Sequence, residues 1–217
     1  MRIDETLARE FPGLRVLELE LSGLKVKKKD DRLEKFKVEI KEQVKADTKN
    51  LEEIKDKPVF RAYRDFYWKV GIDPTKTRPA GEALTRRILG GKDIPTINTL
   101  VDAYNLASLK SSIAIAAFDS FKINKQTLLL RRARPEESFL GIGMTSPIEL
   151  DGVEVVIEDE KNKELIAVYP YRDAEKSKVT EETSQVLLMM CGVPGIEDAQ
   201  LVTASDLSRK FISAFCT

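Results

Sequence analysis

Histidine is absent from this chain of 217 residues, which removes the side chain most often used for proton transfer near neutral pH. Catalytic triads that contain histidine, histidine general bases and histidine metal ligands are excluded by this single absence. Any chemistry must therefore use carboxylates, hydroxyls, lysine, backbone N–H groups or the substrate itself. We expect neither a metal ion nor a cofactor.

Cysteine and long apolar runs are scarce as well. The two cysteines, Cys191 and Cys216, do not have the spacing of a metal site, and we expect Cys191 to be a small buried side chain. No apolar run reaches the length of a membrane-spanning helix, and the first residues show no signal-peptide pattern. We therefore expect a soluble, cytoplasmic protein that contacts no membrane.

Charge is abundant and unevenly distributed. The chain has 36 basic and 36 acidic residues, so its formal net charge is zero. Residues 60–92 contain eight basic and three acidic residues, a net charge of +5, whereas residues 149–217 contain seven basic and fourteen acidic residues, a net charge of −7. A neutral total can therefore hide a basic face. A chain of this length can bury one sizeable core, so we expect one domain.

Residues 95–119 are the stretch around which we expect the fold to be organised. Asn98 supplies a helix start, and apolar residues then recur at spacings of three and four. The apolar run 113–118 is too short for a second helix and is typical of a strand covered on both faces. We expect this strand at the centre of a mixed sheet, with the carboxylate of Asp119 at its end, where sites are often built.

The flanking patterns predict an α+β fold, with a mixed sheet or two packed sheets flanked by helices. We expect a half-buried edge strand at residues 14–21 and a charged amphipathic helix from residue 31 that is interrupted near Asp47. Further predicted elements are helices at 60–70, 80–89 and 181–190, strands at 127–131, 139–142, 153–157, 164–169 and 199–204, and a C-terminal helix that ends at Phe215.

Two basic segments leave alternatives open. Residues 60–70 combine five aromatic residues with Arg61 and Arg64, and the helix at 80–89 carries Arg86 and Arg87 on its outer face. The aromatic side chains favour a core helix, whose basic ends reach the solvent. The four arginines have no run of acids nearby in the sequence, so contact with RNA phosphates is the alternative.

The loop 169–183 is rich in charges of both signs and follows an apolar strand. Thr180 and Thr183 suit a helix cap, but the loop also contains Arg172 and Glu175, which a cap does not need. It is either an exposed loop or the rim of a pocket at a strand end, where specificity residues tend to lie.

Several of these motifs resemble one family. The pattern Asn-x-x-Val-Asp-x-x-Asn at residues 98–105, followed by an apolar strand that ends in Ala-Phe-Asp, is similar to the tRNA-editing (B3/4) domain of the phenylalanyl-tRNA synthetase β subunit. The resemblance covers about residues 60–190, and residues 71–89 look like the stand-alone relatives of that domain. It implies a three-layer α+β fold, a B3/4-like domain at 58–217, and an N-terminal strand and charged helices at 1–57 that pack on the same domain.

The resemblance also implies a function. It predicts a protein that binds tRNA or aminoacyl-tRNA, rather than DNA, and hydrolyses a mischarged ester in trans, with Glu175 at the position that reads the mischarged side chain. We expect the predicted pocket residues to border one concave site, and the predicted RNA-binding residues to form its basic approach. The pocket residues are Asn105, Ser108, Asp119, Arg172, Glu175 and Thr180, and the RNA-binding residues are Arg61, Arg64, Arg86 and Arg87.

One position departs from the family pattern. Synthetase subunits of bacterial type carry histidine immediately before Ala-Phe-Asp, where this chain has Ala116. The change argues against carrying tyrosine editing over to this chain, but hydrolysis of an activated ester needs only an oriented water and backbone N–H donors. No catalytic residue is predicted. A non-catalytic tRNA-binding module or adaptor, and a hydrolase of small amides or esters that shares only the fold, remain as alternatives.

Overall fold

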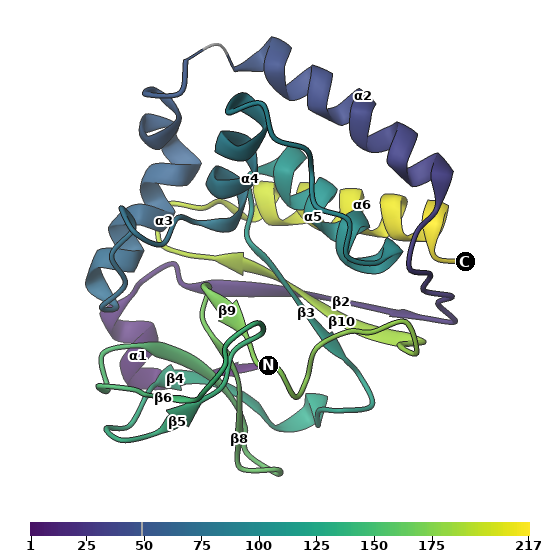
Figure 1. Ribbon diagram of the computed structural model, residues 1–217. Coiled ribbons are helices and arrows are strands. Elements are labelled where there is room, and N and C mark those ends of the chain that lie inside the picture. The colour runs from purple at the N-terminus through teal and green to yellow at the C-terminus, as the bar shows by residue number, and fades with distance from the viewer. Residues whose placement is uncertain (49) are drawn as a thin grey trace.

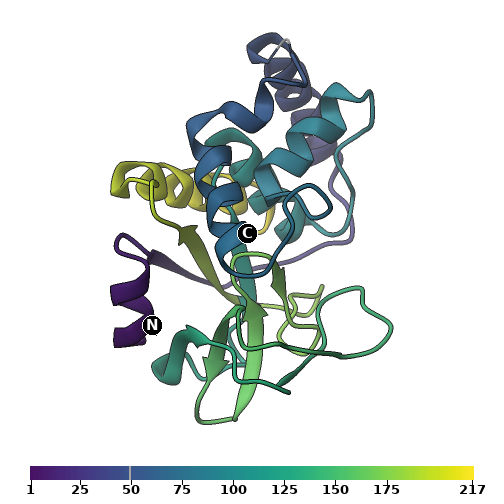
Figure 2. The ribbon, with the colours of Figure 1, turned by 90° about the vertical axis from the view of Figure 1, so that its left-hand side faces the viewer.

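The computed structural model describes residues 1–48 and 50–217 and has an α+β fold in three layers (Figure 1). The second layer is an antiparallel sheet in which β10 (Gln185–Gly192) lies between β2 (Arg15–Ser22) and β3 (Ile115–Asp119). Helices cover one face of this sheet, and a view turned by 90° shows the same order of layers (Figure 2). The helices of this first layer are α2 (Asp31–Asp47), α3 (Pro58–Lys69), α4 (Ala80–Leu89), α5 (Thr99–Ser111) and α6 (Asp198–Phe215).

The third layer is a mixed sheet with the strand order β1-β4-β7-β8-β9. Strand β1 runs parallel to β4, and the other neighbours are antiparallel. The strands of this sheet are β1 (Arg2–Ile3), β4 (Leu128–Arg132), β7 (Val155–Asp159), β8 (Glu164–Val168) and β9 (Arg172–Asp173). The short elements are α1 (Glu5–Glu10), η1 (Ile54–Asp56), η2 (Lys125–Thr127), β5 (Ser138–Phe139) and β6 (Ile148–Glu149). The predicted α+β class, with two packed sheets and flanking helices, is confirmed.

Helix α5 begins where its cap predicts. The side-chain oxygen of Asn98 accepts a hydrogen bond from the backbone N–H of Val101 at 2.9 Å, which satisfies one of the N–H groups left unpaired at a helix start. The face that carries Leu100, Leu106 and Ala107 is completely buried. Helix α5 packs against α6, which itself contacts β2 and β10, and α5 leads directly into β3.

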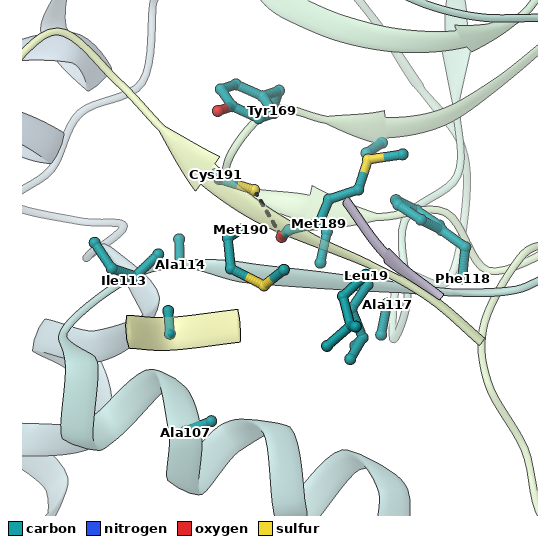
Figure 3. Close-up of a cluster of buried hydrophobic side chains, with 14 of the residues drawn as sticks. Leu19, Ala107, Ile113, Ala114, Ala117, Phe118, Tyr169, Met189, Met190 and Cys191 are labelled. Carbon is teal, nitrogen blue, oxygen red and sulfur yellow. Dashed lines mark hydrogen bonds between the residues drawn. The ribbon is translucent and has the colours of Figure 1, made fainter. Parts of the chain in front are cut away.

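The hydrophobic core lies on both faces of β10. Successive side chains of a strand point to opposite faces, and Met189 and Met190 are both fully buried. Met190 points toward Ala107 of α5, and Met189 points away from that helix (Figure 3). Strand β10 is central in its sheet because it pairs with β2 on one edge and with β3 on the other, and its two faces are buried as well.

Two elements differ from the sequence-based predictions near β10. Residues 181–190 were expected to form a helix, but β10 occupies most of this range. A run of apolar residues that is buried on all sides has the same composition in a strand as in a core helix, so periodicity does not separate them. Strand β3 was expected at the centre of a mixed sheet, and it lies instead at the edge of the antiparallel one, beside β9.

Helix α6 begins earlier than predicted. A strand was expected at residues 199–204, but the helix runs from Asp198, and the side chain of Gln200 accepts a hydrogen bond from the backbone N–H of Glu197 at 2.8 Å. This contact closes the first turn of the helix. Leu201, Ala204 and Ser208 are buried at helical spacing, so the apolar stripe of α6 already runs through the range that was predicted as a strand.

The N-terminal segment is an integral part of this arrangement. Strand β2 pairs with β10 over its whole length, and α2 packs against α5. Helix α2 ends at Asp47, where the sequence predicted an interruption. The predicted division between residues 57 and 58 stays a prediction. Among the residues described, no helix is long and apolar enough to cross a membrane.

Candidate functional site

A cavity of about 560 Å³ lies where the family-like motifs of the chain converge. Helix α5, strand β3 and the segment after β9 each contribute to its wall. We call it the α5 cavity. Its lining residues are Lys28, Ile97, Asn98, Val101, Tyr104, Asn105, Ala117, Ile142, Lys178, Val179, Thr180, Glu181 and Glu182.

The spacing of the residues along α5 explains why they share this wall. Val101, Tyr104 and Asn105 lie three and four residues apart, and side chains at these spacings share one face of a helix. The side-chain amide of Asn105 makes no hydrogen bond to any other described residue, so it is available to a ligand. Tyr104 is largely buried, and burial is the main cause that raises the pKa of its hydroxyl.

A buried charge pair fixes the segment that leads into α5. The Lys37 ammonium donates to the Asp102 carboxylate at 2.5 Å and also to the carbonyl of Pro95 and the hydroxyl of Thr96. The second oxygen of Asp102 accepts from the backbone N–H of Ile97 at 2.9 Å, and burial raises the pKa of this carboxyl. Helix α2 thereby holds the lining segment 97–98 in place.

The predicted pocket residues do not all meet at this cavity. Asn105 and Thr180 line it. The Ser108 hydroxyl is buried and donates to the carbonyl of Ile113 at 2.6 Å, which ties α5 to the start of β3. Asp119 is buried as well, and neither Ser108 nor Asp119 lines the cavity.

Asp119 acts on the cavity through the loop that follows β9. Its carboxylate accepts a hydrogen bond from the Thr183 hydroxyl at 2.7 Å, and that hydroxyl accepts from the backbone N–H of Thr180 at 2.9 Å. Thr183 was predicted to cap a helix together with Thr180, and it closes a turn before β10 instead. The carboxylate at the end of β3 therefore holds the lining loop.

Glu175 lies at the boundary between two cavities, whereas Arg172 lines neither of them and borders a small cavity of about 90 Å³. Glu175 is ion-paired with Lys178, which lines the α5 cavity, and this lysine lowers the pKa of the glutamate. The carboxylate itself lines a second cavity. Arg172 donates to the carbonyl of Ile142 at 2.9 Å and stacks on the ring of Tyr171, so its guanidinium is engaged within the protein.

The second cavity, which we call the β8 cavity, has a volume of about 850 Å³ and is walled by paired charges. Arg134 lies 3.4 Å from Glu137 and 3.5 Å from Glu158, and Lys176 contacts Glu164. The space is larger than the α5 cavity, but it contains none of the residues contributed by α5. It is lined by Lys122, Arg134, Glu137, Ser138, Leu140, Glu158, Glu160, Lys163, Glu164, Leu165, Ile166, Ala174, Glu175, Lys176 and Ser177.

Sequence reasoning did not identify Asp173, the most unusual carboxyl group of the structure. It lies on β9 and accepts a hydrogen bond from the backbone N–H of Ala117 at 3.0 Å. Burial raises its pKa to about 7. With Ala116 and Cys191 it lines a small cavity of about 90 Å³. Nothing in the sequence near Asp173 distinguishes it from other acids of the loop, because its environment arises only where β9 meets β3.

The four predicted RNA-binding arginines have different surroundings. Arg64 and Arg86 both donate to the fully buried Glu82 carboxylate, at 3.2 and 2.8 Å, and the Arg64 contact joins α3 to α4, whereas Arg86 and Glu82 both lie on α4. Arg61 is exposed and lies 3.8 Å from Asp56. Arg87 is exposed and donates to the backbone carbonyl of Asp93 at 2.6 Å. None of the four lines the α5 cavity, whose basic lining residues are Lys28 and Lys178.

Comparison with known proteins gave one match to a family model and a match to a solved structure. A crystal structure of an N-terminal fragment of the phenylalanyl-tRNA synthetase β-subunit from Pyrococcus horikoshii is similar over 99% of this chain, with a TM-score of 0.52 and 12% sequence identity. The present chain covers 48% of that fragment, so it spans about half of its length, and the likeness shows a shared fold. Comparison with curated proteins found no match.

The family model that matches is the B3/4 domain, over residues 62–212. The matched range contains α5, β3, β9 and β10, the elements that build the α5 cavity and the surroundings of Asp173. Since the match extends over more than half of the chain, the protein belongs to the B3/4 domain family.

Proposed function

We propose that the protein is a free-standing B3/4 domain that binds aminoacyl-tRNA and hydrolyses a mischarged aminoacyl ester in trans. The observation that supports this most directly is the α5 cavity, which is built by the motif residues that the chain shares with the editing domain. Its volume of about 560 Å³ lies within the range of cavities that enclose small ligands. An aminoacyl group and its terminal ribose are ligands of this class.

The lining of the cavity suits hydrolysis without histidine. The substrate ester is activated already, so the protein has to hold it, place a water molecule beside it and stabilise the oxyanion that forms. The unpaired side-chain amide of Asn105 can donate to a developing oxyanion, and the Lys178 ammonium adds a positive charge to the same wall. These groups supply binding and charge stabilisation.

Glu175 has the properties of a specificity residue in this function. Lys178 lowers its pKa, so the carboxylate stays ionised near neutral pH and is a weak base. An ionised carboxylate forms strong hydrogen bonds with the ammonium or hydroxyl of a bound amino acid. Glu175 itself lines the β8 cavity and reaches the α5 cavity through its ion pair with Lys178, so we assign recognition of the amino acid to this pair and a contact within the α5 cavity to Thr180.

The tRNA would approach through exposed basic side chains. Lys28 lines the α5 cavity, and Arg61 and Arg87 are exposed on the helical layer. Arg64 and Arg86 are committed to Glu82, so we give them a structural part in holding the two helices that present Arg61 and Arg87. Binding through phosphates releases counterions, and the affinity should fall steeply with salt.

The second candidate function is a tRNA-binding module or adaptor without activity. The observation that favours it is Ala116, a methyl group where related synthetase subunits carry the imidazole. A third candidate, hydrolysis of small amides or esters, uses the same cavity with a different ligand.

A deacylation assay across a panel of mischarged tRNAs distinguishes these functions. The experiment compares the wild-type protein with Asn105→Tyr, which fills the α5 cavity, and with Ser138→Tyr, a matched control on the exposed strand β5 that lines the β8 cavity. We expect the wild-type protein and Ser138→Tyr to deacylate at least one mischarged tRNA, and Asn105→Tyr to lose this activity.

The outcomes separate the alternatives. Salt-sensitive binding of tRNA without deacylation of any member of the panel supports the adaptor. Cleavage of small esters with no response to tRNA supports the third candidate. Loss of activity in Ser138→Tyr rather than in Asn105→Tyr would move the site to the β8 cavity.

A further inference from the structure

Helix α3 stands at one end of the helical layer and exposes the one tryptophan of the chain (Figure 1). Trp68 is 57% exposed, which is unusual for a residue type that is largely buried in most proteins. The other aromatic residues of this helix are at most 2% exposed, and they are Phe60, Tyr63, Phe66 and Tyr67. These four side chains supply the contacts of α3 with the core, so Trp68 is not needed for them.

The indole of Trp68 is not engaged by the described part of the protein. Its N–H makes no hydrogen bond to another described residue, and no second aromatic ring among these residues packs on it. The guanidinium groups that lie over aromatic rings are those of Arg32, Arg132 and Arg172, and none of them covers Trp68. The ring is therefore available to a planar group that approaches from the solvent.

Two arginines share the helix face of Trp68. Arg61 and Arg64 precede it by seven and four residues, and side chains at these spacings lie along one face of a helix. Arg61 is exposed and lies 3.8 Å from the exposed Asp56. Asp65 is the acidic residue of α3 nearest to this face, three residues before Trp68. We call Arg61, Arg64 and Trp68 the Trp68 surface.

The segment that follows α3 is fixed beside this surface and adds positive charge. The Arg64 guanidinium donates to the carbonyl of Pro74 at 3.2 Å, which ties the turn after α3 to the helix. Lys76 and Arg78 follow in the same segment, and both are exposed. Residues 56–78 contain six basic and three acidic residues, a net charge of +3. An exposed aromatic ring therefore lies in a segment of net positive charge.

We propose that the Trp68 surface binds an unpaired nucleotide of the tRNA, a contact that rests on the tRNA binding of the proposed function. The indole of Trp68 stacks on the base, and Arg61 contacts a neighbouring phosphate. Every base has a face that can stack on an aromatic ring, and arginine is a common ligand of phosphate. Bases within a duplex already stack on one another, so the partner is a single-stranded segment. The net positive charge favours RNA over an apolar protein partner.

The Trp68 surface is separate from the α5 cavity, because none of its three residues lines that cavity. A contact there adds affinity for the tRNA without touching the aminoacyl end. Loss of the contact should therefore weaken binding and leave the single-turnover deacylation rate at saturating protein unchanged.

The test uses the fluorescence of Trp68. Because the chain has one tryptophan, all of the tryptophan emission comes from this side chain. The wild-type protein is titrated at low salt with deacylated tRNA, with a short oligocytidylate and with a short RNA duplex. Filter binding then compares the wild-type protein with Trp68→Ala, Trp68→Phe and Phe121→Ala. Phe121 is the matched control, an aromatic residue that is 73% exposed in the turn after β3.

We expect tRNA and oligocytidylate to quench the emission of Trp68 with saturation, and the duplex to bind without comparable quenching. Trp68→Ala should raise the Kd for tRNA by about 5–150-fold, the range for the loss of one stacked base. Trp68→Phe keeps an aromatic ring and should bind more tightly than Trp68→Ala, and Phe121→Ala should bind as wild type does. Urea-induced unfolding should be the same for wild type and Trp68→Ala.

The possible contrary results point to different errors. A tRNA that binds with no change in Trp68 emission, and binds Trp68→Ala equally well, refutes this contact and leaves the proposed function standing. Equal quenching by the duplex refutes the unpaired base. Absence of tRNA binding at low salt refutes both the contact and the proposed binding of tRNA. Emission that changes with protein concentration alone, with a doubled mass in sedimentation, assigns the surface to a second copy of the chain instead of RNA.

Discussion

Two regions of this molecule hold carboxyl groups in opposite surroundings. In the helical layer, Asp102 is paired with Lys37 at 2.5 Å, and Glu82 is paired with two arginines. At the edge where β9 meets β3, Asp173 has a backbone N–H as its partner and forms no ion pair with any described residue. A carboxyl group therefore has a cationic partner in the helical layer, whereas at the β9 edge it has a backbone N–H as its partner and a pKa of about 7.

The two kinds of carboxyl group differ in how they affect the stability of the fold. A buried ion pair fixes how two elements pack, and its removal on one side leaves an uncompensated charge. A carboxyl group without a cationic partner costs folding free energy when it ionises, so its contribution to stability depends on pH. The helical layer therefore holds its carboxyl groups by ion pairs, whereas the β9 edge holds one with a backbone N–H as its partner.

The largest effect should come from breaking the pair in the helical layer. Lys37→Ala leaves the Asp102 carboxylate buried without a cation, and we expect the free energy of unfolding to fall by about 3–5 kcal/mol. Urea-induced unfolding measures it. Lys41→Ala on the same helix is the matched control, because its partner Asp93 is exposed, and it should cost about 1 kcal/mol or less. Equal losses in the two variants would contradict the comparison.

The second effect has the opposite sign. The folded-state pKa of Asp173 is about 7, above its unfolded value near 3.8, so the folded state binds the proton more tightly. The protonated carboxyl group therefore contributes stability below about pH 4, and this contribution is lost as the pH rises from about 4 through 7. Asp173→Asn removes the loss, and we expect it to be more stable than wild type by about 2–4 kcal/mol at pH 8 and to show little difference at pH 4. Thermal unfolding at both pH values measures this. A variant that is less stable at pH 8 would show that the carboxylate has a partner.

The third effect concerns substrate choice. Glu175→Gln removes the charge that Lys178 stabilises, and we expect a change of about 10-fold in the relative deacylation rates of two mischarged tRNAs, with hydrolysis retained. Glu164→Gln, which loses the analogous contact with Lys176 in the β8 cavity, should leave these ratios unchanged. Complete loss of activity toward every substrate in Glu175→Gln would instead make Glu175 the base.

The smallest effect is electrostatic. Arg87 is exposed and bonded only to a carbonyl, so Arg87→Gln should lower the slope of log affinity for tRNA against log salt by about 0.7–0.9, the value for one phosphate contact. Filter binding across a series of salt concentrations measures the slope. Arg64→Gln should leave the slope unchanged and lower stability, because Arg64 is bound to Glu82. An unchanged slope in Arg87→Gln would remove this surface from the tRNA contact.

The sequence predicted the local elements better than their arrangement. The cap at Asn98, the buried face of α5, the hairpin of β7 and β8 and the charged helix α2 follow from spacing and capping, which act within a few residues. The errors at β10 and at the start of α6 arose where long-range burial decides between helix and strand. The predicted strand at 139–142 overlaps β5 only at Phe139, and Gly141 forms an isolated bridge to Ala174.

The site was only partly predictable for a related reason. Asn105 and Thr180 could be assigned to a pocket because their motifs resemble those of a known family. Asp119 belongs to one of these motifs and Ser108 follows Asn105 on the same helix, but hydrogen bonds that no pattern reveals turn both into supports. The pKa of Asp173 is raised by burial where β9 meets β3, against the hydrogen bond from the backbone N–H of Ala117, and this meeting joins segments that lie far apart in the sequence.

The account depends most on the α5 cavity as the place where the aminoacyl end of the tRNA binds. The most direct measurement is a titration of ¹⁵N-labelled protein with non-hydrolysable aminoacyl-adenosine analogues, followed by the shifts of backbone amide signals. We predict saturable shifts at Asn105, Ala117 and Thr180, with the Ala117 amide among the largest because it bonds to Asp173. Shifts confined to Ser138, Leu165 and Lys176 of the β8 cavity, or no shifts with any analogue, would contradict it.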